Sequence, residues 1–175
     1  MNLLLVGPPG VGKSTIGRLC AERLDYTFID IDEKIVARAQ KSISEIFAQQ
    51  GEAAFRVLER EAVEKAVAQD GRVVALGGGA LLDRDNRRLA TTTGPVVCLR
   101  AHEETIRTRL GASRERPLLD EEKGGAALRT LLGERAAHYD SFALQLQTDR
   151  LTPEAAAECI VAELMPWQRT VQTTS

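Results

Sequence analysis

Residues 3–15 read LLLVGPPGVGKST, an apolar strand pattern that leads directly into a glycine-rich segment and then into helical periodicity. Gly7 to Ser14 fit the pattern G-x-x-x-x-G-K-[ST], in the strand-to-helix context that a phosphate-binding loop requires. Glycines allow consecutive backbone N–H groups to surround phosphate oxygens, and the following helix N-terminus adds partial positive charge. The segment therefore predicts a nucleoside triphosphate site. A glycine-rich turn without a ligand is the alternative.

Three side chains of this loop have expected roles toward the nucleotide. Lys13 is expected to reach the β- and γ-phosphates, and the hydroxyl of Ser14 to bind Mg²⁺. Thr15 and the adjoining backbone lie where the α- and β-phosphates would rest.

Short apolar runs rich in β-branched residues alternate along the chain with stretches of helical period. This alternation predicts a parallel sheet covered by helices. The predicted strands are residues 2–6, 26–29, 72–76, 95–99 and 143–147. The predicted helices are residues 13–24, 32–39, 42–69 with a break at Gly51, 83–90, 103–110, 126–143 and 153–164.

Length and composition predict a single globular domain. The chain has 175 residues, 43% of them hydrophobic, and a net charge of −2, which disfavours a nonspecific nucleic-acid binder. The apolar runs are too short for a membrane span and no secretion signal precedes the first strand, so we expect a cytoplasmic protein. The three cysteines, Cys20, Cys98 and Cys159, lie in apolar segments and are expected in the core. The alternative is that one of the three cysteines is a reactive thiol.

Two acids follow the second predicted strand. Asp30 and Asp32 are two positions apart, so they project to one side of an extended chain, at the strand end where ligands of parallel sheets bind. One acid is suited to holding Mg²⁺ through water and the other to accepting a proton from a substrate hydroxyl. The alternative is N-capping of the following helix.

Gly77, Gly78 and Gly79 follow the third predicted strand, where a motor ATPase would carry an acid. Because glycine has no side chain, a substrate could approach their backbone N–H groups closely. The alternative is a turn without a ligand. The absence of an N-K-x-D motif argues against a GTP-driven switch. Residues 111–125 combine charges with flanking glycines, which predicts a mobile lid rather than a merely solvated connection. We assign residues 1–166 to the domain and residues 167–175 to a frayed tail.

Six motifs together resemble those of the shikimate kinases. GPPGVGKSTIGR, FIDID, SISEIF..GE..FR, GGGA, RPLL and ER..HY occur in this order, and the resemblance covers about residues 3 to 164. It implies an α/β fold of three layers, a P-loop kinase with a five-stranded parallel sheet of order 2-3-1-4-5. It also implies transfer of the γ-phosphoryl of ATP to the 3-hydroxyl of shikimate, a step of chorismate and aromatic amino acid biosynthesis, with Mg²⁺ as cofactor. We expect a monomer without nucleic-acid or membrane partners.

The resemblance also assigns roles to single residues. Lys13, Asp32 and Arg116 would be catalytic, with Arg116 closing over the phosphates as part of the lid. Arg56, Arg116 and Arg135 taken alone would each be ordinary surface charges, so their roles rest on the family pattern. The implied ATP-binding residues are Gly10, Val11, Gly12, Lys13, Ser14, Thr15, Arg109 and Arg116. The implied shikimate-binding residues are Asp32, Arg56, Gly78 and Arg135, and the implied metal-site residues are Ser14 and, through water, Asp30.

Two alternatives share part of this pattern. Gluconate kinase, or another small-metabolite kinase of the same fold, would share the phosphate loop, the acids and the lid. A noncatalytic shikimate-kinase-like sensor would normally be fused to a further domain. The sequence departs from the family near Leu76, where a small hydroxyl residue is common, and at Val11, where a smaller residue is common. It also has no clear match to the family's adenine contact around Arg150 to Pro153.

Overall fold

The computed structural model describes the backbone of residues 1–111 and 121–172, and the side chains of residues 1–111 and 125–164. Arg116 and most of the predicted lid, residues 111–125, lie outside the described residues, as does the end of the predicted tail, residues 173–175.

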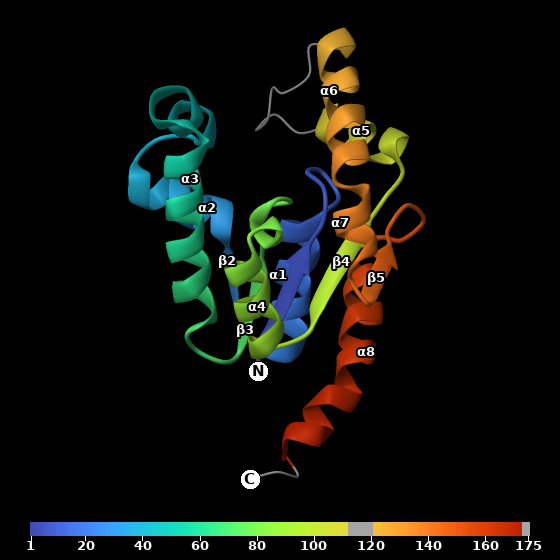
Figure 1. The fold of residues 1–175 in the computed structure, drawn as a ribbon. Coiled ribbons are helices and arrows are strands. Elements are labelled where there is room, and N and C mark those ends of the chain that lie inside the picture. Colours follow the sequence, from blue (N-terminus) through green and yellow to red (C-terminus); the bar gives the residue numbers. More distant parts are fainter. Residues whose placement is uncertain (112–120, 173–175) are drawn as a thin grey trace.

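The described strands form one five-stranded sheet of order β2-β3-β1-β4-β5, and every neighbouring pair is parallel (Figure 1). This confirms the predicted order. In the centre, Leu4 pairs with Val74 on one side and with Val96 on the other. The strands are β1 (Leu3–Val6), β2 (Thr27–Asp30), β3 (Arg72–Ala75), β4 (Val96–Arg100) and β5 (Leu144–Gln147).

The helices follow the predicted order, with differences at their ends. They are α1 (Lys13–Leu24), α2 (Ile31–Ala39), α3 (Ile43–Val67), the 3-10 turn η1 (Ala80–Leu82), α4 (Arg84–Thr93), α5 (Glu103–Gly111), α6 (Glu121–Glu134), α7 (Ala136–Asp140) and α8 (Pro153–Gln172). The break predicted in α3 is confirmed, because Gly51 has φ 80° and ψ 174°. In Figure 1, α2 and α3 rise beyond the strand ends on one side and α6 on the other.

Two helix predictions need correction. The helix predicted over residues 126–143 begins earlier, at Glu121, so helix replaces part of the predicted loop. It is also interrupted at Arg135, which has nonhelical backbone angles and starts the short helix α7. The last helix continues to Gln172 instead of ending at Leu164, so its backbone is helical over residues that sequence analysis assigned to a frayed tail.

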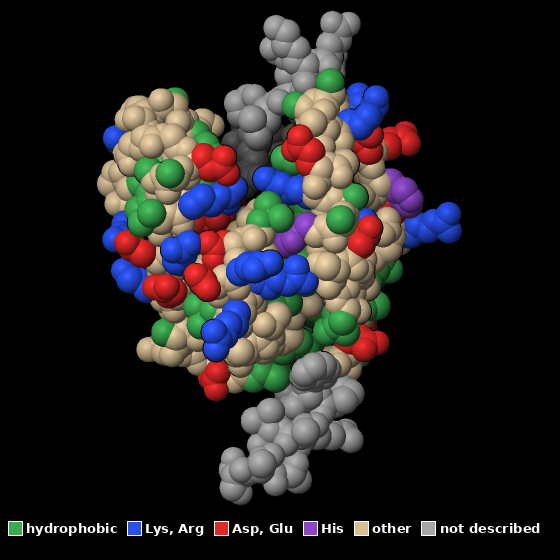
Figure 2. Space-filling model, viewed as in Figure 1, with side chains coloured by type: hydrophobic (Ala, Val, Ile, Leu, Met, Phe, Trp, Pro, Cys, Tyr) green, Lys and Arg blue, Asp and Glu red, His purple; other side chains and the backbone are tan. Residues whose placement is uncertain are grey.

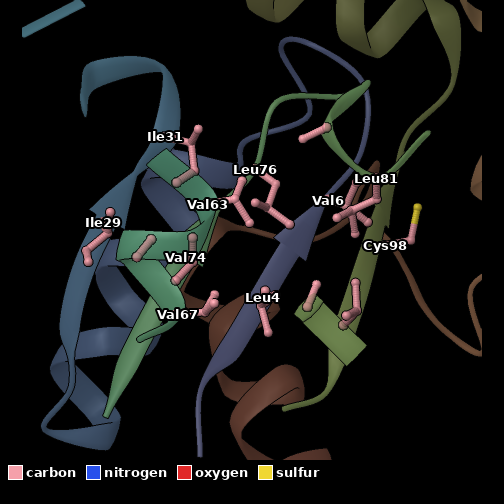
Figure 3. Packing of buried hydrophobic residues seen from close by; sticks show 14 of the residues in the cluster. Leu4, Val6, Ile29, Ile31, Val63, Val67, Val74, Leu76, Leu81 and Cys98 are labelled. Carbon is pink, nitrogen blue, oxygen red and sulfur yellow. The ribbon is translucent and has the colours of Figure 1, made fainter. Parts of the chain in front are cut away.

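Alternation along β1 places apolar residues on both faces of the sheet. Leu4 and Val6 belong to one core cluster, shown in Figure 3 with residues of β3, β4 and α3. Leu3 and Leu5 belong to a second cluster, which includes residues of α1 and α8. Because both faces of the sheet are covered by helices, the structure has the predicted three layers.

The cysteine prediction is confirmed for two of the three residues. Cys20 and Cys98 are buried, and burial raises the pKa of each thiol to about 11. Cys159 is exposed, so its assignment to the core was wrong. The side of α8 that packs into the core carries Ala156, Ala157 and Ile160 instead. Among the described helices, none is long and apolar enough to cross a membrane.

Candidate functional site

A cavity of about 550 Å³ opens at the carboxyl ends of the parallel strands. The phosphate-binding loop forms one part of its wall, and residues from β2, β3, α5, α6 and the connection after β5 form the rest. Figure 2 shows acidic and basic side chains gathered at the hollow between the α2–α3 side and α6. The position agrees with the rule that open parallel sheets bind ligands outside the carboxyl ends of their strands.

The phosphate-binding loop has the backbone that a glycine-rich anion site needs. Gly10 and Gly12 have φ of 75° and 102°, values that residues other than glycine rarely adopt. A Cβ on Gly10 would also lie 2.6 Å from Cγ of Leu110. Gly12 caps α1 without a side-chain hydrogen bond, and the first turn of α1 contains no acid. The N-terminus of α1 therefore presents its N–H groups and its partial positive charge to the cavity.

The predicted ATP-binding residues of the loop, Gly10 to Thr15, all line this cavity. Lys13 donates hydrogen bonds of 2.9 Å to the carbonyl oxygens of both Gly7 and Pro8, which hold its ammonium group across the loop. Val11 is completely buried and packs in the core cluster that includes Ile16.

Asp30 caps the helix α2 and also contacts Ser14. Its Oδ1 accepts hydrogen bonds from the backbone N–H of Asp32 at 3.0 Å and of Glu33, which caps α2. Its Oδ2 accepts a 2.6 Å hydrogen bond from the hydroxyl of Ser14. The capping alternative is therefore confirmed for Asp30, and it leaves the second oxygen beside Ser14. These two oxygens are hard ligands of the kind that Mg²⁺ prefers, so the residues fit that ion.

The carboxylates of Asp32 and Glu59 flank Gly77. A Cβ on Gly77 would lie 3.3 Å from Oδ1 of Asp32 and 3.1 Å from Oε1 of Glu59. Glu59 is almost fully buried and accepts a 2.6 Å hydrogen bond from Nη1 of Arg56. Burial raises the pKa of Glu59, and the nearby charge of Asp32 raises it further, against the effect of Arg56. In Arg56 itself, burial would lower the pKa, but the hydrogen bonds and charges of Glu59 and Glu52 together outweigh it and raise the pKa.

Sequence reasoning missed Glu59, although a signal was present. Phe55, Glu59 and Val63 recur every four residues in α3, and all three are buried. A carboxylate within an apolar helical stripe needs a buried cationic partner, and Arg56 lies three positions before it.

The two arginines predicted to bind a carboxylate converge beside the glycine triplet. A Cβ on Gly79 would lie 3.2 Å from Nη2 of Arg56 and 3.2 Å from Nη2 of Arg135. A Cβ on Gly78 would lie 3.3 Å from Nη1 of Arg135 and 2.8 Å from the hydroxyl of Tyr139. That hydroxyl donates a 3.2 Å hydrogen bond to the carbonyl of Gly78. Burial raises the pKa of Tyr139, while its hydrogen bond with Arg135 acts in the opposite direction.

Arg109 joins the phosphate-binding loop to the connection after β5. Its Nη1 donates to the carbonyl of Val11 at 3.1 Å and to Oγ1 of Thr148 at 2.9 Å, and its Nη2 donates to the carbonyl of Thr148 at 2.9 Å. Thr148, Leu151 and Pro153 line the cavity next to Arg109. Leu151 and Pro153, which lie where the sequence showed no clear match to the family's adenine contact, therefore form part of the cavity wall.

Asp149 fixes this connection to the start of α5. It accepts hydrogen bonds from the backbone N–H of His102 at 2.8 Å, from Thr105 at 2.6 Å and from Gln147 at 2.5 Å. Burial would raise the pKa of Asp149, but these hydrogen bonds outweigh it and hold the pKa well below its usual range. Sequence analysis did not single out Asp149.

The comparison with protein families matches residues 9–165 to the model described as shikimate kinase. The chain belongs to the shikimate kinase family. A shikimate kinase from Xanthomonas campestris pv. campestris is 43% identical over 174 residues, which cover 95% of this chain and 94% of the relative. One from Thermobifida fusca is 46% identical, with 92% and 93% covered. The chain is therefore an ATP-dependent kinase that phosphorylates shikimate.

Solved structures of shikimate kinases share this fold. The shikimate kinase from Acinetobacter baumannii, solved in complex with shikimate, has a TM-score of 0.86 and 32% identity, with 94% of this chain and 93% of that chain covered. A gluconokinase from Sinorhizobium meliloti is 17% identical with a TM-score of 0.62, over 99% of this chain and 97% of that chain, which is a likeness of fold alone.

Proposed function

We propose that the cavity holds ATP and shikimate together, with the residues divided into a phosphate side and a carboxylate side. The observation that carries this division is the convergence of Arg56 and Arg135 at Gly79, where Arg135 also lines the cavity that the phosphate-binding loop forms in part. A planar carboxylate is the group that two guanidinium groups recognise best. Asp32 also lines this cavity.

On the phosphate side, the residues of the loop from Gly10 to Thr15 bind the triphosphate. Backbone N–H groups at the start of α1 meet the phosphate oxygens, and Lys13 moves its ammonium group from the carbonyls of Gly7 and Pro8 to the transferring phosphoryl. Arg109 takes the position beside the base, together with Leu151 and Pro153. Arg116 lies outside the described residues, and its closing over the phosphates stays a prediction.

On the acceptor side, Arg56 and Arg135 hold the carboxylate of shikimate and the backbone of Gly78 approaches the ring. Asp32 orients the 3-hydroxyl and accepts its proton as the oxygen attacks the γ-phosphoryl in line. Glu59 is less suited to this task, because it is buried and paired with the partly buried Arg56. Its role is to position Arg56.

Mg²⁺ is the cofactor that fits the pair formed by Ser14 and Asp30. Ser14 would bind the ion through its hydroxyl, and Asp30 would hold it through water with the carboxylate oxygen that does not cap α2. When bound, the ion offsets negative charge on the phosphate oxygens. We also infer a cytoplasmic location, since Cys20 and Cys98 are free thiols, as expected in a reducing compartment.

The test is ADP release with Mg-ATP against shikimate, gluconate and quinate in parallel. We expect turnover with shikimate. We also expect Arg56→Ala to raise the KM for shikimate about 10- to 150-fold, since a charged hydrogen bond is worth roughly 1.5–3 kcal/mol. Arg88→Ala, which removes an exposed arginine of α4, is the matched control. Turnover with gluconate instead would favour the other kinase, and nucleotide binding without any turnover would favour a sensor.

A further inference from the structure

Arg56 already holds a carboxylate that belongs to the chain itself. Oε1 of Glu52 accepts hydrogen bonds from Nη2 of Arg56 at 2.9 Å and from Nε at 3.2 Å. Both atoms lie on one edge of the guanidinium group, whereas Glu59 is bound by the remaining nitrogen, Nη1. Arg56 is therefore bound by one carboxylate on each side.

One nitrogen of the edge that Glu52 occupies lies beside the proposed carboxylate site. Nη2 of Arg56 is the atom that would lie 3.2 Å from a Cβ on Gly79, at the same distance as Nη2 of Arg135. Of the two N–H groups of this Nη2, one already donates to Glu52, so a carboxylate that bridges the two arginines brings a second negative charge to the same nitrogen.

The two partners of Arg56 differ in how firmly they are held. The side chain of Glu59 is only 2% exposed, while that of Glu52 is 66% exposed. An exposed pair four residues apart on a helix changes an equilibrium by only about twofold, whereas a partner removed from a buried pair leaves an uncompensated charge. Glu59 thus anchors Arg56, and Glu52 can exchange with solvent or with another carboxylate.

The helix is broken directly before Glu52. Gly51 interrupts α3 with φ 80° and ψ 174°, and a Cβ placed on it would meet nothing within 4 Å. Glu52 is therefore the first residue after the break, in the exposed first turn of the second half of α3.

From these contacts we propose that Glu52 is a specificity-determining residue that competes with the carboxylate of the substrate for Arg56. The proposal rests on the assignment of Arg56 as a substrate-binding residue. In the ligand-free enzyme Glu52 keeps the arginine neutralised and oriented. Shikimate displaces Glu52, and smaller or poorly placed anions, which cannot also reach Arg135, do not.

The experiment compares the wild type with Glu52→Gln, which keeps the side-chain size and removes the charge. Glu64→Gln, on the exposed side of the same helix, is the matched control. For Glu52→Gln we expect the KM for shikimate to fall about twofold at low ionic strength with kcat unchanged, and the advantage to shrink as salt is added. The KM for the methyl ester of shikimate, which carries no carboxylate, is expected not to change.

A KM for shikimate that stays the same or rises in Glu52→Gln would overturn the proposal, as would an equal decrease for the ester. Arg56→Ala separates this failure from failure of the carboxylate site. If Arg56→Ala raises the KM for shikimate while Glu52→Gln does not lower it, the site is right and competition by Glu52 is wrong. If Arg56→Ala leaves this KM unchanged, the assignment of Arg56 is wrong and the proposal for Glu52 falls with it.

Discussion

The hydroxyl of Ser14 lies 2.6 Å from Oδ2 of Asp30, although Ser14 lies in the first turn of α1 and Asp30 ends β2. The other oxygen of Asp30 caps α2. A single carboxylate thus fixes the start of a helix and presents an oxygen beside the phosphate-binding loop. Structural and chemical roles can be separated here by substitution, because asparagine caps helices as well as aspartate does but carries no charge.

We predict that Asp30→Asn raises the Mg²⁺ concentration needed for half-maximal activity at least tenfold and changes the free energy of unfolding by less than about 0.5 kcal/mol. Activity across a Mg²⁺ titration and urea unfolding measure the two effects. The control is Asp83→Asn, because Asp83 caps α4 with the same two hydrogen bonds but lies outside the residues that line the cavity. An unchanged Mg²⁺ requirement in Asp30→Asn would contradict the metal assignment.

Asp32→Asn tests proton transfer. We expect kcat to fall about 10²- to 10⁴-fold while the KM for ATP stays within a few-fold, since the loss of a general base affects the chemical step. Coupled ADP release measures both constants. Glu33→Gln is the control, because Glu33 follows in the same helix turn but forms an exposed ion pair with Arg18. Normal turnover by Asp32→Asn would rule out the proposed role.

Gly78→Ala tests the close approach of the glycine triplet to the site. Its Cβ would lie 2.8 Å from the hydroxyl of Tyr139 and 3.0 Å from the carbonyl oxygen of Gly7, so backbone or side chain must shift. We expect a loss of about 1–3 kcal/mol in the free energy of unfolding and a raised KM for shikimate. In Gly133→Ala the new Cβ meets nothing within 4 Å, and we expect a gain of up to about 1 kcal/mol because alanine favours α6. Urea unfolding of both variants checks the contrast.

Asp149→Asn tests the link between α5 and the connection after β5. Because the pKa of Asp149 is lowered in the folded state, its contribution to stability is fully present at neutral pH and is lost as the pH falls below the ordinary carboxyl pKa of about 4. We therefore expect Asp149→Asn to be about 1–2 kcal/mol less stable than the wild type at pH 7, with the difference shrinking toward pH 3.

Unfolding by urea at a series of pH values provides this measurement. Asp140→Asn, which removes an exposed partner of Arg100, is expected to stay within about 0.5 kcal/mol of the wild type at each pH. A stability difference for Asp149→Asn that does not depend on pH would show that the ionised carboxylate is not the stabilising group.

Several site features could not be read from the chain because they depend on contacts between distant elements. The pairing of Arg56 with Glu59 lies within one helix and could have been predicted from the apolar stripe of α3. The contacts of Arg109 with Val11 and Thr148 join residues from three parts of the chain, so no local spacing signals them. Helix ends were equally hard to predict, as the break at Arg135 shows.

Local sequence patterns were enough to predict the parallel sheet and the phosphate-binding loop. Both depend on local rules, namely alternating apolar runs, helical periodicity and the backbone freedom of glycine at fixed spacing. Tertiary structure alone decided that Ser14 meets Asp30 and that Arg56 meets Arg135 at Gly79. It also decided that Cys159 faces solvent. The reason is that strand order and helix packing set which side chains come together, and this depends on the free energy of the whole core rather than on neighbours in sequence.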